Sequence, residues 1–348
     1  MTAAAPAGRA CPGGSREPYR PSQGTLLYLS RDDLGSLGIT MLEVVDAVDA
    51  GCAAKGRGEV VMPPKLSLHG EGDAYSQVMA ATLAGGGGLG AKWVTLFPQN
   101  AARGLPVTNG LVVLGDPVTG LPAAVMDAAA ITAWRTGASV GVAARYLARR
   151  GATAAGILGC GVQARTSVRA LTVVLPELAR VRCHDVVPAA AESFVAELGR
   201  ELPGVVFEIV RAPEDVVAGA GVVVTAITMT AQVRPPLGPG LLEPGALVAA
   251  LDYDAAWSAA AMAECDRFFC DDTATVSATR AAGVRLTGIP DETAGDLGEL
   301  AAGLIPGRTG DDERLFCLNL GMALEDVVTA ELALRRARVL GVGRELPL

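Results

Sequence analysis

A short glycine motif between an expected strand and an expected helix constrains the fold of this chain more than any other feature. Gly159, Cys160 and Gly161 follow the apolar run at residues 154–158 and precede a helical pattern at residues 163–174. In a Rossmann turn the first glycine makes the tight bend, and the second lets the backbone approach a pyrophosphate at the helix N-terminus. The motif therefore predicts a dinucleotide-binding turn, although a chain with 43 glycines also offers purely structural turns.

The second half of the chain alternates strand patterns with helix patterns. Further strands are expected at residues 181–184, 205–210, 221–227, 246–251 and 267–271, with helices at residues 189–199 and near 213–219. Strands that alternate with helices form a parallel sheet with right-handed crossovers. The second half is therefore predicted to be a Rossmann-type domain.

An acidic residue ends the second of these strands. Asp185 lies about 20 residues beyond the motif, where an acid accepts hydrogen bonds from the ribose 2′-hydroxyl of NAD and repels the 2′-phosphate of NADP. Val186 and Val187 follow it, and no nearby arginine is available to hold that phosphate. The sequence predicts NAD as cofactor rather than NADP, with a plain strand-end turn as the alternative role of Asp185.

The first half of the chain is richer in strands. A strand at residues 25–29 precedes a helical pattern at residues 30–55, and a C-terminal amphipathic helix at residues 322–340 is expected to return to this half. The remaining expected strands cover residues 60–62, 65–68, 77–83, 91–97, 107–114 and 121–127. Such a run of strands predicts an antiparallel or mixed sheet, and therefore a smaller α+β domain beside the Rossmann domain in an α/β protein.

Charge and cysteine content exclude several classes of protein. The formal net charge of −8 argues against nucleic acid as a partner. The seven scattered cysteines include no CxxC pair and predict reduced thiols in a cytoplasmic protein. With only two histidines in the chain, we expect no metal site.

The sequence predicts neither a targeting segment nor a membrane span. Residues 1–24 lack an apolar core and resemble a disordered tail. The longest uncharged stretch, residues 216–233, contains Gly219 and Gly221 and is expected to be a buried strand with its flanks.

Several further motifs occur in one order along the chain, and together they resemble the ornithine cyclodeaminase/mu-crystallin family over residues 25–342. They are Gly90-Ala91-Lys92-Trp93-Val94, Gly104-Leu105-Pro106, Thr119-Gly120-Leu121-Pro122, Ile131-Thr132-Ala133-Trp134-Arg135-Thr136-Gly137-Ala138, the glycine motif through Ala164, Leu297-Gly298-Glu299 and Pro306-Gly307-Arg308.

The resemblance implies two domains and an activity. Residues 25–135 would form a substrate-binding and dimerisation domain completed by residues 314–348, residues 136–313 would form the NAD-binding domain, and the protein would be a homodimer. The implied function is NAD-dependent hydride transfer at the α-carbon of a small amino acid or cyclic imine. Two alternatives stay open: ornithine cyclodeaminase, which makes proline and ammonia, and a non-catalytic mu-crystallin-like binding protein.

The resemblance also implies roles for single residues. Lys92 and Asp254 would be catalytic, with Asp254 as acid or base. The substrate would be bound by Lys65, Lys92, Arg135, Gln77 and Leu320. The cofactor would be bound by Arg135, Thr136, Gly159, Gly161, Val162, Gln163, Asp185, Thr228 and Asn319.

Three departures from the family pattern argue against ornithine as the substrate. Lys65 stands where many members have an arginine, which keeps the charge and loses the bidentate fork. Gln77 stands where ornithine cyclodeaminase has a glutamate near the distal amine. Residues 251–257 replace the usual Gly-Lys after the catalytic aspartate.

The residue types fit the expected chemistry. Lys65, Lys92 and Arg135 together would neutralise and orient a substrate carboxylate, and three converging cations would be costly without an anionic ligand. Asp254 is the best candidate for proton transfer because neither histidine is placed for it.

Each of these residues also has a structural alternative. Lys65 and Lys92 could be solvated strand lysines, and Arg135 could form a surface ion pair. Asp252 and Asp254 share one face of a strand, so they could be an acid pair, a metal site or turn residues.

Overall fold

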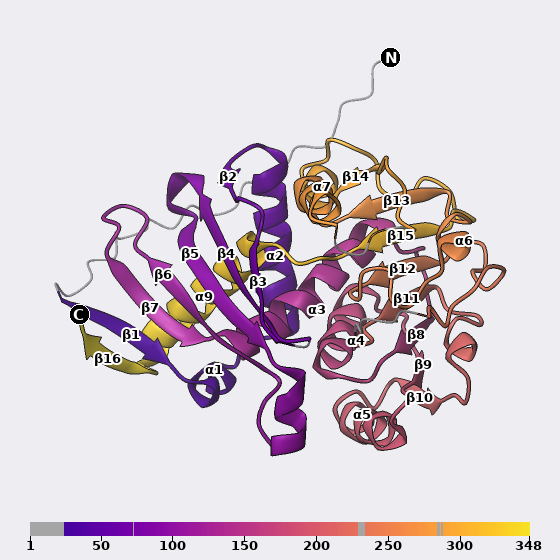
Figure 1. The fold of residues 1–348 in the computed structure, drawn as a ribbon, viewed down its shortest axis with the longest axis horizontal. Helices are drawn as coiled ribbons and strands as arrows, with labels where there is room; N and C mark the ends of the chain where they lie inside the picture. The colour runs from indigo at the N-terminus through magenta and orange to yellow at the C-terminus, as the bar shows by residue number, and fades with distance from the viewer. Residues whose placement is uncertain (1–23, 72, 229–233, 284–285, 287) are drawn as a thin grey trace, which may run out of the picture.

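The chain folds into two eight-stranded sheets with helices packed between and around them (Figure 1). The structure is a computed structural model, and it describes residues 24–348 except residues 72, 229–233, 284–285 and 287. Residues 1–23 of the expected tail, including Cys11, lie outside the described residues. The two sheets, one of them wholly parallel, confirm the predicted α/β class.

The first sheet is mixed. Its order is β16-β1-β7-β6-β5-β4-β2, and β3 also pairs with β4. Only β1 and β7 pair in parallel, and the other neighbours are antiparallel. The strands are β1 (Thr25–Leu29), β2 (Val60–Val61), β3 (Leu66–His69), β4 (Tyr75–Leu83), β5 (Gly88–Leu96), β6 (Thr108–Gly115), β7 (Pro122–Asp127) and β16 (Arg344–Pro347).

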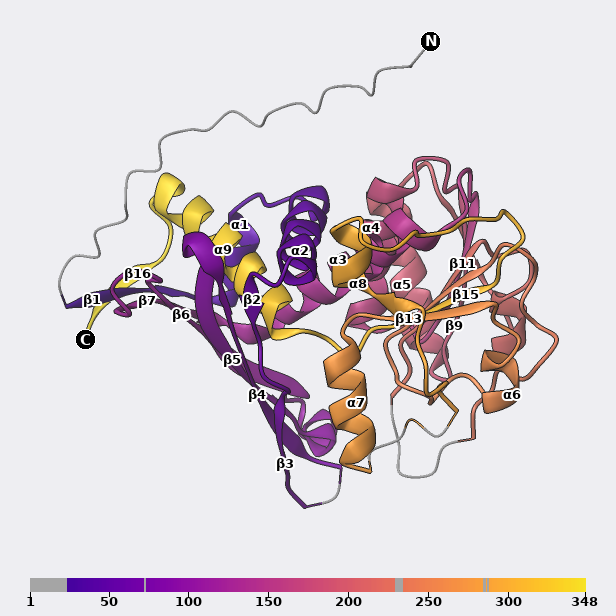
Figure 2. The ribbon, with the colours of Figure 1, turned by 90° about the horizontal axis from the view of Figure 1, so that it is seen from above.

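Helices cover one face of this sheet (Figure 2). They are α1 (Arg31–Ser36), α2 (Met41–Gly56), α3 (Ala128–Leu147) and α9 (Ala323–Leu340). The single helix expected at residues 30–55 is wrong. Gly38 adopts a left-handed backbone with φ of 62°, and Thr40 then begins a new helix with a capping box to Glu43.

The second sheet is parallel throughout, in the order β10-β9-β8-β11-β12-β15-β13-β14. Because all pairs are parallel, the carboxyl ends of its strands meet at one edge. The strands are β8 (Ala154–Leu158), β9 (Arg180–His184), β10 (Val206–Ile209), β11 (Val222–Thr225), β12 (Leu247–Ala250), β13 (Arg267–Cys270), β14 (Gly295–Asp296) and β15 (Leu315–Leu318).

Short helices connect these strands. They are α4 (Val162–Val174), α5 (Pro188–Glu201), α6 (Ala259–Met262), α7 (Thr273–Ala281) and α8 (Leu297–Ala301). The helix expected near residues 213–219 is only the 3-10 turn η3 (Pro213–Val216). Two more 3-10 turns, η1 (Ala84–Gly86) and η2 (Pro98–Arg103), lie in the first sheet's connections.

The chain crosses between the two halves more than once. α3 runs through residue 135, the expected domain boundary, and packs against both α2 and α4. β15 follows residue 313, yet it inserts into the second sheet between β12 and β13. The chain then returns to the first sheet as α9, which packs against β4 and β5.

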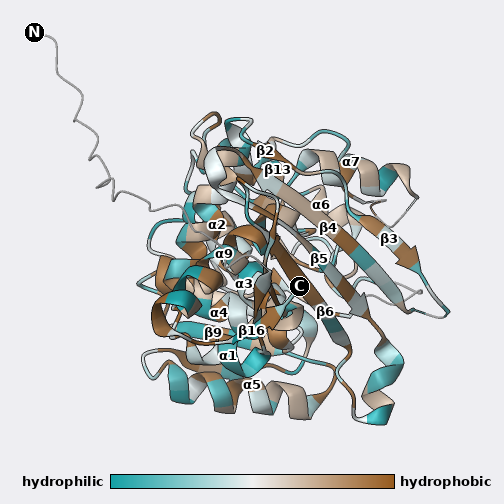
Figure 3. Cartoon of the chain, turned by 90° about the vertical axis from the view of Figure 1, so that its left-hand side faces the viewer, coloured by the Kyte–Doolittle hydropathy of each residue, from teal (hydrophilic) through white to brown (hydrophobic). Residues whose placement is uncertain are grey.

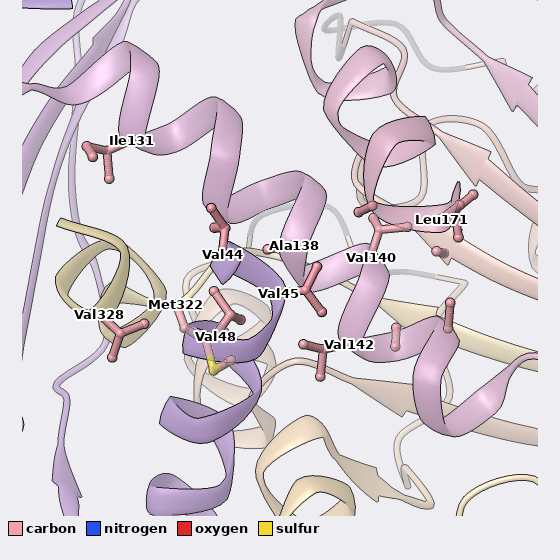
Figure 4. Packing of buried hydrophobic residues seen from close by; sticks show 14 of the residues in the cluster. Val44, Val45, Val48, Ile131, Ala138, Val140, Val142, Leu171, Met322 and Val328 are labelled. Carbon is pink, nitrogen blue, oxygen red and sulfur yellow. The ribbon is translucent and has the colours of Figure 1, made fainter. Parts of the chain in front are cut away.

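One core joins these elements. Figure 4 shows Val44, Val45 and Val48 of α2 beside residues of α3 and beside Met322 and Val328 at the start of α9. All five side chains are buried, and full burial of a valine contributes roughly 1.5–3 kcal/mol. This core joins the first sheet to the second through α2, α3 and α9. None of the helices that the structure describes is long and apolar enough to cross a membrane.

Candidate active site

The turn after β8 has the geometry that a bound pyrophosphate requires. Gly159 has a φ of 89°, and a Cβ there would lie 2.6 Å from the carbonyl oxygen of Ala226, so only glycine fits. Gly161 begins α4 without any side-chain cap, and space is open around it. The first N–H groups of α4 are therefore left for an anionic ligand.

Asp185 holds this turn in place. Its carboxylate accepts hydrogen bonds from the backbone N–H of Cys160 at 2.7 Å and of Val187 at 2.8 Å. Gln163, in the first turn of α4, has a buried Oε1 with no hydrogen-bond partner among the described residues. Val162 is exposed at the start of α4, and Thr228 is exposed three residues beyond β11, next to residues 229–233, which are outside the described residues.

Lys92 and Arg135 come together in a buried cluster with two acidic residues of α9. Lys92 on β5 is 1% exposed, and its Nζ donates to Oδ1 of Asp326 at 2.7 Å. Arg135 on α3 donates to Glu325 at 3.0 Å, and its Nε lies 3.1 Å from Asp326. Both cations therefore have carboxylate partners within the protein, rather than waiting for an anionic ligand as the sequence suggested.

Sequence reasoning missed Glu325 and Asp326. They stand at the start of a helix, where acidic residues usually face solvent and interact with the helix dipole. A signal was nevertheless present, because they are the only charged residues between Arg314 and Glu331. A helix that is apolar on all sides is buried, and charges within it need partners.

Burial changes the acid–base properties of this cluster. Burial, and then the nearby Arg135 cation, lowers the pKa of Lys92 to about 8. Burial raises the pKa of Glu325. Burial and the neighbouring Glu325 raise the pKa of Asp271 to about 7, and this carboxylate accepts a hydrogen bond from the backbone N–H of Gly321. The cluster therefore contains groups that titrate near neutral pH.

Lys65 differs from the other two cations. It donates to the carbonyl oxygen of Leu320 at 2.7 Å and to the Tyr253 hydroxyl at 3.3 Å, and no carboxylate of the described residues forms an ion pair with it. Gly321, the next residue, packs against Arg135, since a Cβ there would lie 2.5 Å from a guanidinium nitrogen. Lys65 and Arg135 thus flank one short segment of backbone.

The remaining expected residues surround this segment. Asn319 is buried and accepts from the Ser139 hydroxyl at 3.1 Å, and Thr136 has a buried hydroxyl without a partner among the described residues. Gln77 donates to Ser67 at 3.1 Å. Gln77 lies two residues from Met79, which is directly opposite Lys92, so its side chain belongs to the same face of the first sheet.

The two aspartates after β12 have separate environments. Asp252 is buried and accepts from the Thr225 hydroxyl at 2.8 Å and from the Ile227 N–H at 3.0 Å, and burial raises its pKa to about 6. Asp254 has a buried Oδ1 with no hydrogen-bond partner in the described part of the chain. Asp252 therefore supports the loop, and Asp254 retains a free acceptor.

The sequence of this chain is similar to that of a known protein family and of individual enzymes. The model of the ornithine cyclodeaminase/mu-crystallin family matches residues 28–339. The alanine dehydrogenase of Archaeoglobus fulgidus is 33% identical over 328 residues, which are 92% of this chain and 98% of that protein.

Two solved structures share the fold over nearly their whole lengths. The Thermococcus litoralis Delta(1)-pyrroline-2-carboxylate reductase, solved with NADH and L-proline, has a TM-score of 0.81 at 29% identity and covers 92% of this chain and 99% of its own. An archaeal alanine dehydrogenase dimer with bound NAD has a TM-score of 0.81 at 30% identity, with coverage of 93% and 99%.

Proposed function

Because the chain belongs to the ornithine cyclodeaminase/mu-crystallin family, we infer that it is an NAD-dependent oxidoreductase acting on the C–N bond of a small amino or imino acid. The observation that carries this function is the position of the cation cluster. Lys65, Lys92 and Arg135 gather around the segment that follows β15, at the edge where the glycine turn also lies. A cofactor and a small acid would therefore meet at this edge.

The glycine turn supports NAD as the cofactor. Gly159 and Gly161 leave room for a pyrophosphate at the start of α4, and Asp185, at the end of β9, would favour a free ribose hydroxyl over a 2′-phosphate. Val162, Gln163, Thr136, Thr228 and Asn319 would complete the cofactor site, with Arg135 beside the nicotinamide. When bound, the nicotinamide accepts or returns the hydride of the substrate α-carbon.

The charges of the cluster support a carboxylate-bearing substrate. Glu325 and Asp326 offset Lys92 and Arg135, whereas Lys65 forms no ion pair with any carboxylate in the described part of the chain. A substrate carboxylate between Lys65 and Arg135 would restore this balance. Leu320 and Gln77 would line the rest of the substrate pocket.

Proton transfer would fall to Asp254, and Lys92 would stabilise charge on the substrate. Asp254 follows the carboxyl end of β12, and its Oδ1, which has no partner among the described residues, would accept a proton from the substrate nitrogen or from water. Lys92, with its pKa lowered to about 8 by burial and by Arg135, can also exchange a proton near neutral pH.

The experiment that tests this function is a screen of amino acids and cyclic imines with NAD and NADH, with ammonia measured in parallel. A dehydrogenase would form NADH and ammonia in equal amounts from an amino acid, or consume NADH with an imine. Ammonia without net NADH would instead identify a cyclodeaminase. Binding of NADH without any turnover would identify a binding protein and contradict the proposal.

The outer face of the first sheet supports a homodimer. None of the described helices covers this face (Figure 2), and Figure 3 shows β4, β5 and β6 turned toward the viewer with many apolar residues. Leu66, Val78, Trp93 and Leu111 stand in one row across four strands, each between 37% and 59% exposed. An apolar row of this kind marks a protein interface, and the archaeal relative is a dimer.

The cysteines support a reducing compartment, and we propose the cytoplasm. Six cysteines lie within the described residues, and all are free thiols.

A further inference from the structure

We propose that Tyr253 is a positioning residue that fixes Lys65 for the substrate carboxylate; this rests on the proposed function. Tyr253 lies in the loop after β12 on the second sheet, and Lys65 directly precedes β3 of the first. The two side chains meet, with Lys65 Nζ 3.3 Å from the phenol oxygen and 5.7 Å from the ring centre. Tyr253 thus connects the cofactor half of the molecule to the substrate wall.

The ammonium group of Lys65 has three N–H donors. One donates to the carbonyl oxygen of Leu320 at 2.7 Å, and a second donates to the Tyr253 hydroxyl at 3.3 Å. Two fixed donors determine the direction of the third because the group is tetrahedral. Lysine ordinarily lacks the rigid fork of arginine, and these two contacts supply the missing orientation.

The backbone at Tyr253 supports a functional constraint. Tyr253 has a φ of 61°, and it is the only non-glycine residue with positive φ among those the structure describes. A tyrosine in this conformation is strained and persists only where its surroundings hold it there. Asp252, directly before it, is anchored by hydrogen bonds from the Thr225 hydroxyl and the N–H of Ile227. In this backbone conformation the Tyr253 hydroxyl meets Lys65.

The contact also explains why a lysine can stay there unpaired. The Tyr253 hydroxyl and the Leu320 carbonyl are neutral acceptors, so they orient the cation without neutralising it. Lys65 acts electrostatically on the buried Asp271, but it forms no ion pair with a carboxylate of the described residues, so its charge is available to an anionic ligand. A carboxylate in place of Tyr253 would have consumed that charge, as Asp326 does for Lys92.

The test measures steady-state kinetics of Tyr253→Phe with the substrate found in the screen. Loss of the hydroxyl should raise KM about three- to tenfold and change kcat less than twofold, because the contact orients a binding group. In a Lys65→Met background the same substitution should change KM less than twofold. If Tyr253→Phe leaves KM unchanged in the protein that keeps Lys65, the proposal is overturned. An equal change of KM with and without Lys65 overturns it as well.

Two further variants separate positioning from folding. Tyr253→Gly removes the ring but suits the positive φ, so its Tm should stay within a few degrees of the wild type while KM rises at least as much. Tyr146→Phe is the matched control, because the Tyr146 hydroxyl on α3 donates at 2.9 Å to Asp49 on α2 and not to a residue of the proposed substrate site. It should leave KM unchanged, and a Tyr253→Gly enzyme with lower Tm and unchanged KM would show a purely structural tyrosine.

A readout without turnover keeps the contact testable if no substrate is found. Acetylation of Lys65 by a succinimidyl ester, followed by mass spectrometry, should be at least twofold faster in Tyr253→Phe. Lys55 is the internal reference, because it is paired with Asp272 and Asp296 in either protein. Absence of turnover in the wild type defeats the proposed function, whereas an unchanged Lys65 labelling rate defeats the contact itself.

Discussion

The ion pair between Lys92 and Asp326 is buried on both sides, so each partner depends on the other. Replacing Asp326 with Asn should lower the free energy of unfolding by about 3–5 kcal/mol, because the buried Lys92 loses its carboxylate. Replacing Lys92 with Met should cost less, because Asp326 keeps Arg135 at 3.1 Å. The double variant should cost less than the sum by at least about 1 kcal/mol. Urea denaturation of the four proteins at pH 7 measures this coupling.

The matched control for this cycle is the exposed pair Arg57 and Glu59, at 2.8 Å. Arg57→Met with Glu59→Gln should show no measurable coupling, because solvent screens both groups. Strictly additive effects at Lys92 and Asp326 would contradict the buried pair.

Asp271 should make the free energy of unfolding depend on pH. Burial raises the pKa of Asp271 in the folded protein to about 7, above its ordinary value of 3.8, so the native state holds a proton that the unfolded state releases. Its contribution to stability is complete below about pH 4 and is lost as pH rises through about 7. The neutral variant Asp271→Asn should therefore gain roughly 2–3 kcal/mol relative to the wild type between pH 5 and pH 8.5.

Urea denaturation at the two pH values measures this gain. Asp311→Asn, at an exposed aspartate, is the control, and its difference from the wild type should not change with pH. A constant difference for Asp271→Asn as well would show that this carboxyl group is already ionised at pH 5 in the folded protein.

At the scale of elements, the two glycines between β8 and α4 should affect different properties, one the stability of the protein and the other cofactor binding. Gly161 has open space and a φ of −77°, so Gly161→Ala should leave Tm nearly unchanged and weaken NADH binding at least about tenfold by obstructing the pyrophosphate. Gly159→Ala meets the carbonyl of Ala226 and should lower the free energy of unfolding by about 2 kcal/mol or more.

Thermal denaturation and NADH fluorescence titration distinguish the two effects. Gly204→Ala, where a Cβ would also meet no atom within 4 Å, is the control and should change neither quantity. If Gly161→Ala binds NADH as tightly as the wild type, this turn is structural and does not bind the pyrophosphate.

At the scale of the whole molecule, the apolar face of the first sheet predicts the oligomeric state. Trp93 lies at the middle of the exposed row and is 50% exposed, so Trp93→Lys places a charge inside the expected interface and should convert the dimer to a monomer. Light scattering after size-exclusion chromatography measures the mass. Val339→Lys, at an equally apolar but separate exposed position on α9, should leave the dimer intact.

If Trp93→Lys remains a dimer, the interface lies elsewhere on the protein. If the wild type is a monomer at micromolar concentration, this face is not a dimer interface. The fold of each chain should persist in either case, because Trp93 points away from the buried face of β5.

Local patterns in the sequence were sufficient to predict much of the fold of this protein. The glycine turn, the strand at residues 154–158 and the acid at Asp185 could be predicted because each depends on neighbours in sequence. The alternation of strands and helices gave the α/β class, since burial on both faces of a parallel sheet leaves a continuous apolar pattern in each strand. The break of the first helix at Gly38 was missed because apolar spacing continued across it.

Only the tertiary structure decided how the charges pair. Lys92 and Asp326 are 234 residues apart, and Arg135 and Glu325 are 190 apart, so no local pattern could join them. The same holds for Lys65 and Tyr253, which are 188 residues apart and belong to segments next to different sheets. Residue types along the chain specified which charges were present, whereas burial in the folded protein determined that Lys92 and Arg135 pair with carboxylates and that Lys65 forms no ion pair among the described residues.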